Sequence, residues 1–162
     1  MTHKITDNFL PEEEFKDLKS FFLSSDIEWF YNKKVAFDEA EANHDFGFTH
    51  TFYMNNQWTS SFAPLLDPIL DKINPFSIIR IKANLATKAP EHFETGWHRD
   101  FDKECKTAVF YLNTNNGYTL FENDVRVDSI ENRFVEFNSL EKHTGVTHTD
   151  ENVRALINFN YI

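Results

Sequence analysis

The sequence predicts an α+β fold that is mainly β, with a jelly-roll core and N-terminal helices packed on one sheet. Three observations predict it: two helical patterns in the first half of the chain, many short alternating segments, and tight turns between those segments. Helices followed by short strands indicate a sandwich or barrel core. A jelly roll fits this order and can enclose a site between its two sheets.

The first helix is predicted to begin at Pro11, because proline suits the first helical position. Residues 12–14 are three glutamates, which complement the positive end of the helix dipole. The second helical pattern covers residues 60–73, and Pro68 in its interior predicts a kink or two short helices. The apolar residues that recur at helical spacing in the first helix are Phe15, Leu18 and Phe22.

The remaining segments alternate with the period of strands. In the last of them, Val153, Ala155, Ile157 and Phe159 alternate with Arg154, Leu156, Asn158 and Asn160. The predicted strands are 77–88, 107–113, 118–122, 125–130, 133–137 and 153–161.

Length and composition predict one domain spanning residues 1–162. A chain of 162 residues with 41% hydrophobic content and 18 phenylalanines can bury a core without disulfides. Cys105 is the only cysteine, so an internal disulfide and a Cys-rich zinc site are excluded. The single cysteine suits a reducing cytosol, and no signal peptide or membrane span is apparent, so we expect a cytoplasmic protein without membrane partners. The oligomeric state is not readable.

The net charge of −10 limits the kinds of binding partner that the sequence predicts. A chain this acidic gains little from phosphate contacts, so nucleic acid is not an expected partner. The overall charge favours neutral or cationic substrates, although a local basic patch would overrule it.

Two residues, His98 and Asp100, stand two positions apart in a segment predicted to be extended. Because side chains alternate along a strand, both point toward the same face. A second histidine would complete the set of two histidines and one carboxylate that holds non-heme Fe(II) and leaves coordination positions open. His143 follows an apolar strand and is preferred; His148 fits an exposed polar turn. Without such a partner, the pair would be an ordinary solvent-facing one. The other histidines, predicted as surface or strand residues, are His3, His44, His50 and His92.

Arg154 stands in the final strand among the apolar residues Val153, Ala155, Leu156 and Ile157. A buried guanidinium is costly unless it meets an anion, and its planar fork matches a carboxylate. Two interpretations are open. Arg154 binds the distal end of a dicarboxylate co-substrate, or it forms a structural salt bridge with an acidic residue.

Together with the histidine–aspartate pair, His143 and Arg154 eleven residues later make a pattern that resembles the Fe(II)/2-oxoglutarate-dependent dioxygenase superfamily. Within it, the chain most resembles the compact prolyl-4-hydroxylase-like proteins. Tyr118 replaces the second of two glycines that this family usually carries before the following threonine. The resemblance covers nearly the whole chain and implies a double-stranded β-helix. Further matching segments are 7–11, and 107–113 followed by 116–121.

The resemblance implies Fe(II) as the metal and 2-oxoglutarate as co-substrate. Arg154 would pair with the C5 carboxylate of 2-oxoglutarate. Tyr111 and, less favoured, Asn84 are candidates for a second contact, because both lie on strand faces that could line the barrel. The residues that would bind iron and act in catalysis are His98, Asp100 and His143.

The implied reaction is hydroxylation of a primary substrate with release of succinate and CO₂. Asp100 favours hydroxylation, since family members that halogenate lack this carboxylate. The substrate remains open among a prolyl residue in a peptide, a free amino acid and another small molecule. One alternative is a catalytically silent metal-binding jelly roll that serves as a sensor or binding module. Another is nucleic-acid demethylation, which the acidic balance disfavours. The acidic stretch 37–50 could form a lid, but a solvated loop is preferred.

Overall fold

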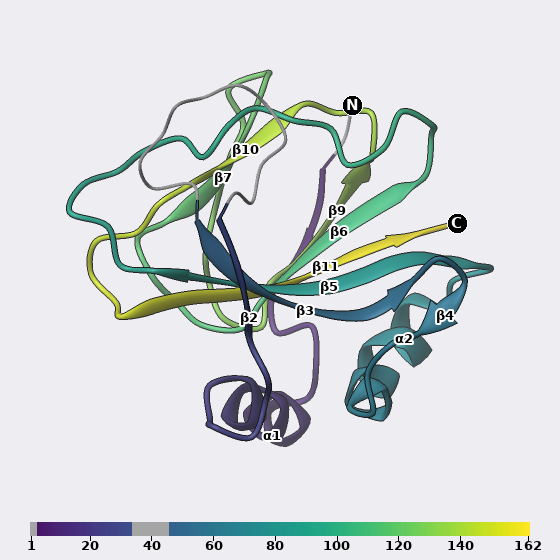
Figure 1. The fold of residues 1–162 in the computed structure, drawn as a ribbon. Coiled ribbons are helices and arrows are strands. Elements are labelled where there is room, and N and C mark those ends of the chain that lie inside the picture. Colours follow the sequence, from purple (N-terminus) through teal and green to yellow (C-terminus); the bar gives the residue numbers. More distant parts are fainter. Residues whose placement is uncertain (1–2, 34–45) are drawn as a thin grey trace.

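Two antiparallel sheets form the body of the computed structural model, which describes residues 3–33 and 46–162 (Figure 1). The large sheet contains, in spatial order, β1 (Lys4–Thr6), β9 (Phe134–Asn138), β6 (Lys106–Tyr111), β11 (Val153–Tyr161), β5 (Ile78–Thr87), β3 (Gly47–Met54) and β2 (Phe30–Asn32), with β4 (Gln57–Trp58) paired to β3. The small sheet contains β10 (His143–Val146), β7 (Tyr118–Phe121) and β8 (Arg126–Asp128). The architecture is a jelly-roll-like β-sandwich, so the predicted class is confirmed.

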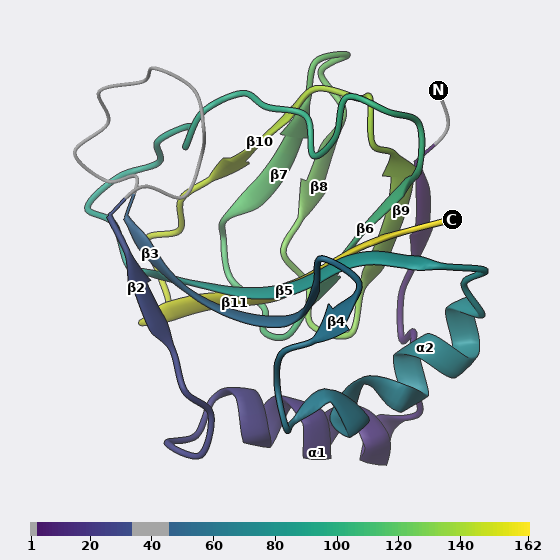
Figure 2. The ribbon, with the colours of Figure 1, turned by 45° about the vertical axis from the view of Figure 1, so that its right-hand side comes forward.

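The helices pack on the outer face of the large sheet (Figure 2). α1 (Glu12–Phe22) begins one residue after Pro11, which precedes the helix rather than opening it. The second helical segment is broken as predicted, into a 3₁₀ helix (Ala63–Leu66) and α2 (Asp67–Ile73). Pro68 lies in the first turn of α2, where no intrahelical hydrogen bond is lost. The buried helix residues that contact the sheet core are Phe15, Leu18, Phe22, Leu66 and Ile69.

Strands β5 and β11 carry different chemistry on their two faces. Because side chains alternate along a strand, successive residues point toward the helices and toward the small sheet. The helix-facing residues are apolar and at most 1% exposed: Ile81, Ala83, Ala155, Ile157 and Phe159. The residues that face the interior of the sandwich are largely polar: Arg80, Lys82, Asn84, Arg154 and Asn158.

The space between the sheets is divided between packing and a cavity. A second apolar cluster joins the sheets, with Phe121 and Val127 from the small sheet against Val135 and Phe137 from β9. Nearer β5, a cavity of about 270 Å³ remains. A pocket at this place can bring residues of both sheets to one ligand.

Five strands are absent from the sequence prediction. Four of them (β1, β2, β4 and β10) have two to four residues, too few for alternation to be recognised. The fifth, β3, includes the end of the predicted loop 37–50: Phe48 pairs with Leu85 of β5, so residues 47–50 form a strand. The acidic part of that loop, 37–45, lies outside the described residues. Across residues 3–33 and 46–162, no helix has the length and apolar character needed to cross a membrane.

Candidate metal centre and co-substrate cavity

The structure brings His98, Asp100 and His143 together. One potential ligand atom from each side chain lies within 4.8 Å of the other two, and no other such group is found in the described part of the chain. His98 and His143 form an isolated antiparallel bridge in which each backbone N–H donates to the other's carbonyl, at 2.9 and 3.0 Å. This bridge sets the imidazoles side by side, with ring centroids 4.5 Å apart. His98 therefore lies in a single bridge, not in the extended strand that its spacing predicted.

Backbone contacts determine which ring nitrogen of each histidine faces the cluster. Nδ1 of His98 lies 3.0 Å from the carbonyl of Gly96, and Nδ1 of His143 lies 3.1 Å from the carbonyl of Glu141. A carbonyl only accepts, so each Nδ1 carries the proton and donates. Each Nε2 is then left unprotonated, the form in which imidazole binds a metal.

Asp100 is held by two residues that the sequence did not single out. Arg80 Nη2 donates to its Oδ1 at 3.2 Å, and Asn160 Nδ2 donates to its Oδ2 at 3.0 Å. Arg80 and Asn160 are register partners on β5 and β11, and Arg80 Nε donates to Asn160 Oδ1 at 3.0 Å. The carboxylate is thus fixed in place by the large sheet.

The electrostatics favour the protonation states that metal binding requires. Burial alone would raise the pKa of Asp100, but His143, Arg80 and Asn160 outweigh it and hold that pKa below its usual value. Burial lowers the pKa of His143, although Asp100 opposes this. An ionised carboxylate and neutral imidazoles are the ligand forms for a divalent cation.

Arg154 is buried at another part of the cavity. Its Nε donates to Ser129 Oγ at 2.7 Å, and its Nη2 approaches Thr119 Oγ1 at 3.5 Å. No carboxylate in residues 3–33 and 46–162 pairs with it, so the structural salt bridge finds no partner there. A Cβ on Gly117 would lie 2.9 Å from Asn115 Oδ1, 3.0 Å from the Val146 carbonyl and 3.1 Å from Arg154 Cδ, so a larger residue here would crowd the arginine stem.

The two candidates for a second co-substrate contact lie in different places. Tyr111 is fully buried and is not among the cavity-lining residues; its hydroxyl lies 2.8 Å from Thr119 Oγ1, and its ring centroid lies 5.8 Å from Arg154 Cζ. Asn84 lines the cavity directly, and within the described part of the chain its side chain makes one hydrogen bond, a long one of 3.5 Å to the Lys82 carbonyl. Thr119 itself was missed, since a threonine in a short strand gives no signal.

His148 contradicts its prediction as an exposed turn residue, because it is fully buried. The turn folds onto the body of the protein. The His148 carbonyl accepts a hydrogen bond from the Ala89 N–H at 3.0 Å, and the next residue, Thr149, forms hydrogen bonds with Asn116. His148 is not part of the His98 cluster, as expected.

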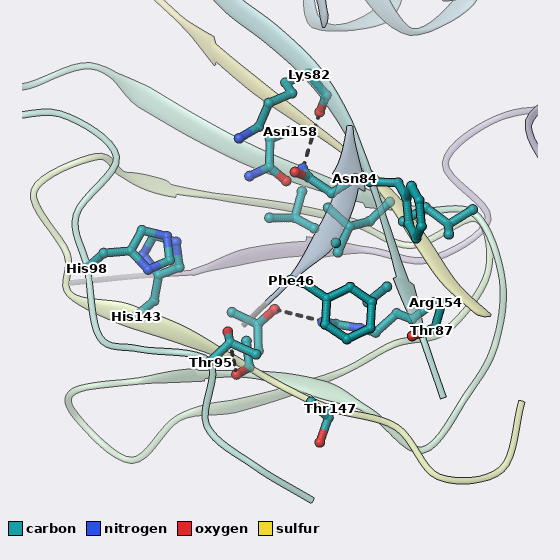
Figure 3. A pocket seen from close by; sticks show the side chains of 18 of the residues that line it. Phe46, Lys82, Asn84, Thr87, Thr95, His98, His143, Thr147, Arg154 and Asn158 are labelled. Carbon is teal, nitrogen blue, oxygen red and sulfur yellow. Dashed lines mark hydrogen bonds between the residues drawn. The ribbon is translucent and has the colours of Figure 1, made fainter. Parts of the chain in front are cut away.

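One cavity connects these elements. In Figure 3 the His98–His143 pair lies on one side and Arg154 on the other, with Asn84 and Asn158 between them along one wall. A two-histidine, one-carboxylate cluster that shares a cavity with a buried guanidinium can hold a divalent metal and a carboxylate-bearing ligand together.

The fold and site define a jelly-roll-like protein with a candidate mononuclear metal centre. Solved structures share this fold. A viral collagen prolyl hydroxylase from Paramecium bursaria Chlorella virus-1, solved as a 2-oxoglutarate complex, superposes with a TM-score of 0.63 at 13% identity, covering 99% of this chain and 95% of that chain.

Two further structures are similar. A prolyl hydroxylase from Trichoplax adhaerens, in complex with a hypoxia inducible factor peptide fragment, superposes with a TM-score of 0.70 at 14% identity, covering 98% of this chain and 83% of that chain. A 2OG-Fe(II) oxygenase family protein from Burkholderia pseudomallei superposes with a TM-score of 0.67 at 12% identity, covering 98% of this chain and 84% of that chain. No family model and no curated protein matches the chain. The likeness confirms the prolyl-hydroxylase-like fold that the resemblance predicted.

Proposed function

We propose that this chain is an Fe(II)- and 2-oxoglutarate-dependent dioxygenase, a hydroxylase whose single domain spans residues 1–162. The observation that carries the proposal is the buried guanidinium of Arg154, which pairs with no carboxylate among the described residues and lies in the same cavity as His98, Asp100 and His143. The core would be a double-stranded β-helix, an interpretation supported by the order β5-β11-β6-β9 in the large sheet, opposed by β10-β7-β8.

The donor set suits Fe(II). Two imidazole nitrogens and one carboxylate leave coordination positions open for a chelating co-substrate and oxygen. Bound iron would supply the activation of oxygen that couples decarboxylation of 2-oxoglutarate to hydroxylation. Arg80 and Asn160 would keep the Asp100 carboxylate aimed at the metal.

Arg154 would bind the C5 carboxylate of 2-oxoglutarate through its guanidinium fork. Thr119 lines the cavity, and its Oγ1 contacts both Arg154 and the Tyr111 hydroxyl, so Thr119 would be a second donor, with Tyr111 fixing its orientation. Asn84 remains the alternative second contact from the opposite wall. These residues would orient the co-substrate and would not take part in bond making.

The primary substrate would be a prolyl or peptide group, or a small amino-acid-like molecule. The Trichoplax adhaerens structure, a fold neighbour bound to a peptide fragment, supports a peptide. The cavity volume of about 270 Å³ supports a small reacting group, because ligand pockets are usually ~300–1,000 Å³. We expect a cytoplasmic enzyme that acts neither on nucleic acid nor at a membrane.

The competing proposal is a silent jelly roll that binds metal without turnover. Incubation of the protein with Fe(II), 2-oxoglutarate and oxygen distinguishes the two, since uncoupled turnover yields succinate and CO₂ even without a primary substrate. The dioxygenase proposal expects succinate formation that depends on both iron and 2-oxoglutarate. Metal and 2-oxoglutarate binding without succinate would favour the silent alternative.

A further inference from the structure

Lys82 occupies a position in the cavity that the proposed reaction leaves unused. It lies on the inward face of β5, between Arg80, which contacts Asp100, and Asn84. Its side chain is half-buried, and in Figure 3 it extends past Asn158 toward the side where His98 and His143 lie. No acceptor in the described part of the chain pairs with its ammonium.

The cavity wall is basic, in contrast with the acidic chain. Among the described lining residues there are five basic side chains, Arg80, Lys82, Lys88, Arg99 and Arg154, and one carboxylate, Asp100. Arg80 pairs with Asp100, and Arg99 Nε donates to the Leu140 carbonyl at 2.7 Å. Lys88 is exposed at the rim. Among the described residues that line the cavity, Lys82 and Arg154 are therefore the two buried or half-buried cations that lack an anion, and the proposed function assigns an anion only to Arg154.

Asn158 adds an unsatisfied polar group beside Lys82. The two residues are register partners on β11 and β5. Asn158 Oδ1 is buried without a hydrogen-bond partner among the described residues. A buried amide oxygen and a half-buried ammonium, both unpaired, are costly unless a ligand completes their hydrogen bonds.

The environment of Lys82 disfavours its charge in the absence of a ligand. Burial lowers the pKa of Lys82, Arg80 adds to the decrease, and Asp100 opposes it. A carboxylate beside the ammonium would reverse this effect, because an opposite charge at short range stabilises the ionised form.

We propose that Lys82, with Asn158 beside it, is a second anion-binding site that selects a primary substrate carrying a carboxylate. This inference rests on the proposed function, since it assumes that 2-oxoglutarate occupies Arg154 and leaves Lys82 for the substrate. The Asn158 amide hydrogen-bonds a polar group next to that carboxylate. The local basic wall, not the overall charge of −10, then determines which substrates enter.

The test uses the whole protein loaded with Fe(II) and 2-oxoglutarate in the absence of oxygen, so that Arg154 is occupied and no turnover follows. Three probe pairs differ only by acid and amide: acetate and acetamide, propionate and propionamide, L-proline and L-prolinamide. Calorimetry measures the affinity of each probe for wild type, Lys82→Met and Lys82→Arg. Lys4→Met, which removes an exposed lysine on β1 outside the cavity, is the matched control.

We expect at least one acid to bind wild type about tenfold or more tightly than its amide, as for a charge-assisted hydrogen bond. Lys82→Met should lose this preference, and Lys82→Arg and Lys4→Met should keep it. Equal affinity for acids and amides, including no binding of either, would overturn the inference. So would a preference that survives in Lys82→Met, because the acid would then be binding elsewhere.

The loading step separates this inference from the proposed function. If 2-oxoglutarate fails to perturb the iron site of wild type before any probe is added, the proposed function fails. If 2-oxoglutarate binds and the probes are not discriminated, only the assignment of Lys82 fails. Formation of the same iron and 2-oxoglutarate complex by Lys82→Met shows that the variant is folded.

Discussion

The two faces of β5 and β11 carry contrasting side chains, apolar toward the helices and largely polar toward the cavity. On the helix side, Ile81, Ile157 and Phe159 are buried in one core cluster with apolar residues of α1 and α2. One residue away along the same strands, Lys82, Asn158 and Asn160 face the cavity or the Asp100 carboxylate. The alternation of side chains along a strand therefore places the core residues and the residues of the candidate site on opposite sides of one sheet. Substitutions on one face should leave the other largely intact, since their side chains do not touch.

The largest expected effect comes from removing a metal ligand on the cavity side. His98→Ala and Asp100→Ala should each abolish 2-oxoglutarate-dependent CO₂ release, because two ligands do not complete the iron site. The release of labelled CO₂ is the measurement. Asp102→Ala, which removes an exposed carboxylate two residues further on, should retain turnover. Normal turnover in both ligand variants would refute the site assignment.

The next largest effect is expected from a substitution in the core on the helix-facing side of the large sheet. Phe110 on β6 is fully buried among Phe9, Phe15 and Phe134, and Phe110→Ala should destabilise the fold by about 3–5 kcal/mol. Urea unfolding measures this loss, and iron affinity of the folded variant should stay within about twofold of wild type.

Phe76→Ala is the matched control for this core substitution. Phe76 is 93% exposed, so its removal should change stability by less than about 0.5 kcal/mol. Equal losses of unfolding free energy in Phe110→Ala and Phe76→Ala would show that packing on the helix-facing side does not stabilise the fold.

Arg154→Met separates a co-substrate contact from a structural ion pair. Hydrogen bonds to charged groups contribute about 1.5–3 kcal/mol, so the 2-oxoglutarate requirement should rise roughly ten- to hundredfold. Without 2-oxoglutarate, the variant should be as stable as wild type or more so, because a buried charge without a counter-ion is removed. Thermal unfolding with and without 2-oxoglutarate measures both quantities. An unchanged requirement, together with a loss of about 3–5 kcal/mol, would support the salt-bridge interpretation instead.

The smallest effects locate the second co-substrate contact. Thr119→Val should weaken 2-oxoglutarate binding about fivefold, as expected for one neutral hydrogen bond, and Tyr111→Phe should weaken it less, because its hydroxyl acts through Thr119. Titration of 2-oxoglutarate against each variant gives the order. A larger effect from Asn84→Ala would move the contact to the opposite wall.

Much of the fold followed from alternation. β11 has the predicted bounds, and Arg154 and Asn158 on it line the cavity, because a long half-buried strand shows its period in the sequence. The network of Arg80 and Asn160 on Asp100 could not be predicted, since it depends on the register between β5 and β11. His148 looked exposed because its neighbours are polar, yet tertiary hydrogen bonds to Asn116 bury that turn.

An anaerobic titration of Fe(II), with and without 2-oxoglutarate, tests most directly whether the cavity face is one iron and co-substrate site. We expect one iron per chain, tighter iron binding when 2-oxoglutarate is present, and a new visible absorption band that requires both. Asp100→Ala should lose the iron, and Arg154→Met should keep it but need more 2-oxoglutarate. Absence of iron binding in wild type, or iron binding that 2-oxoglutarate neither tightens nor perturbs, would contradict the account.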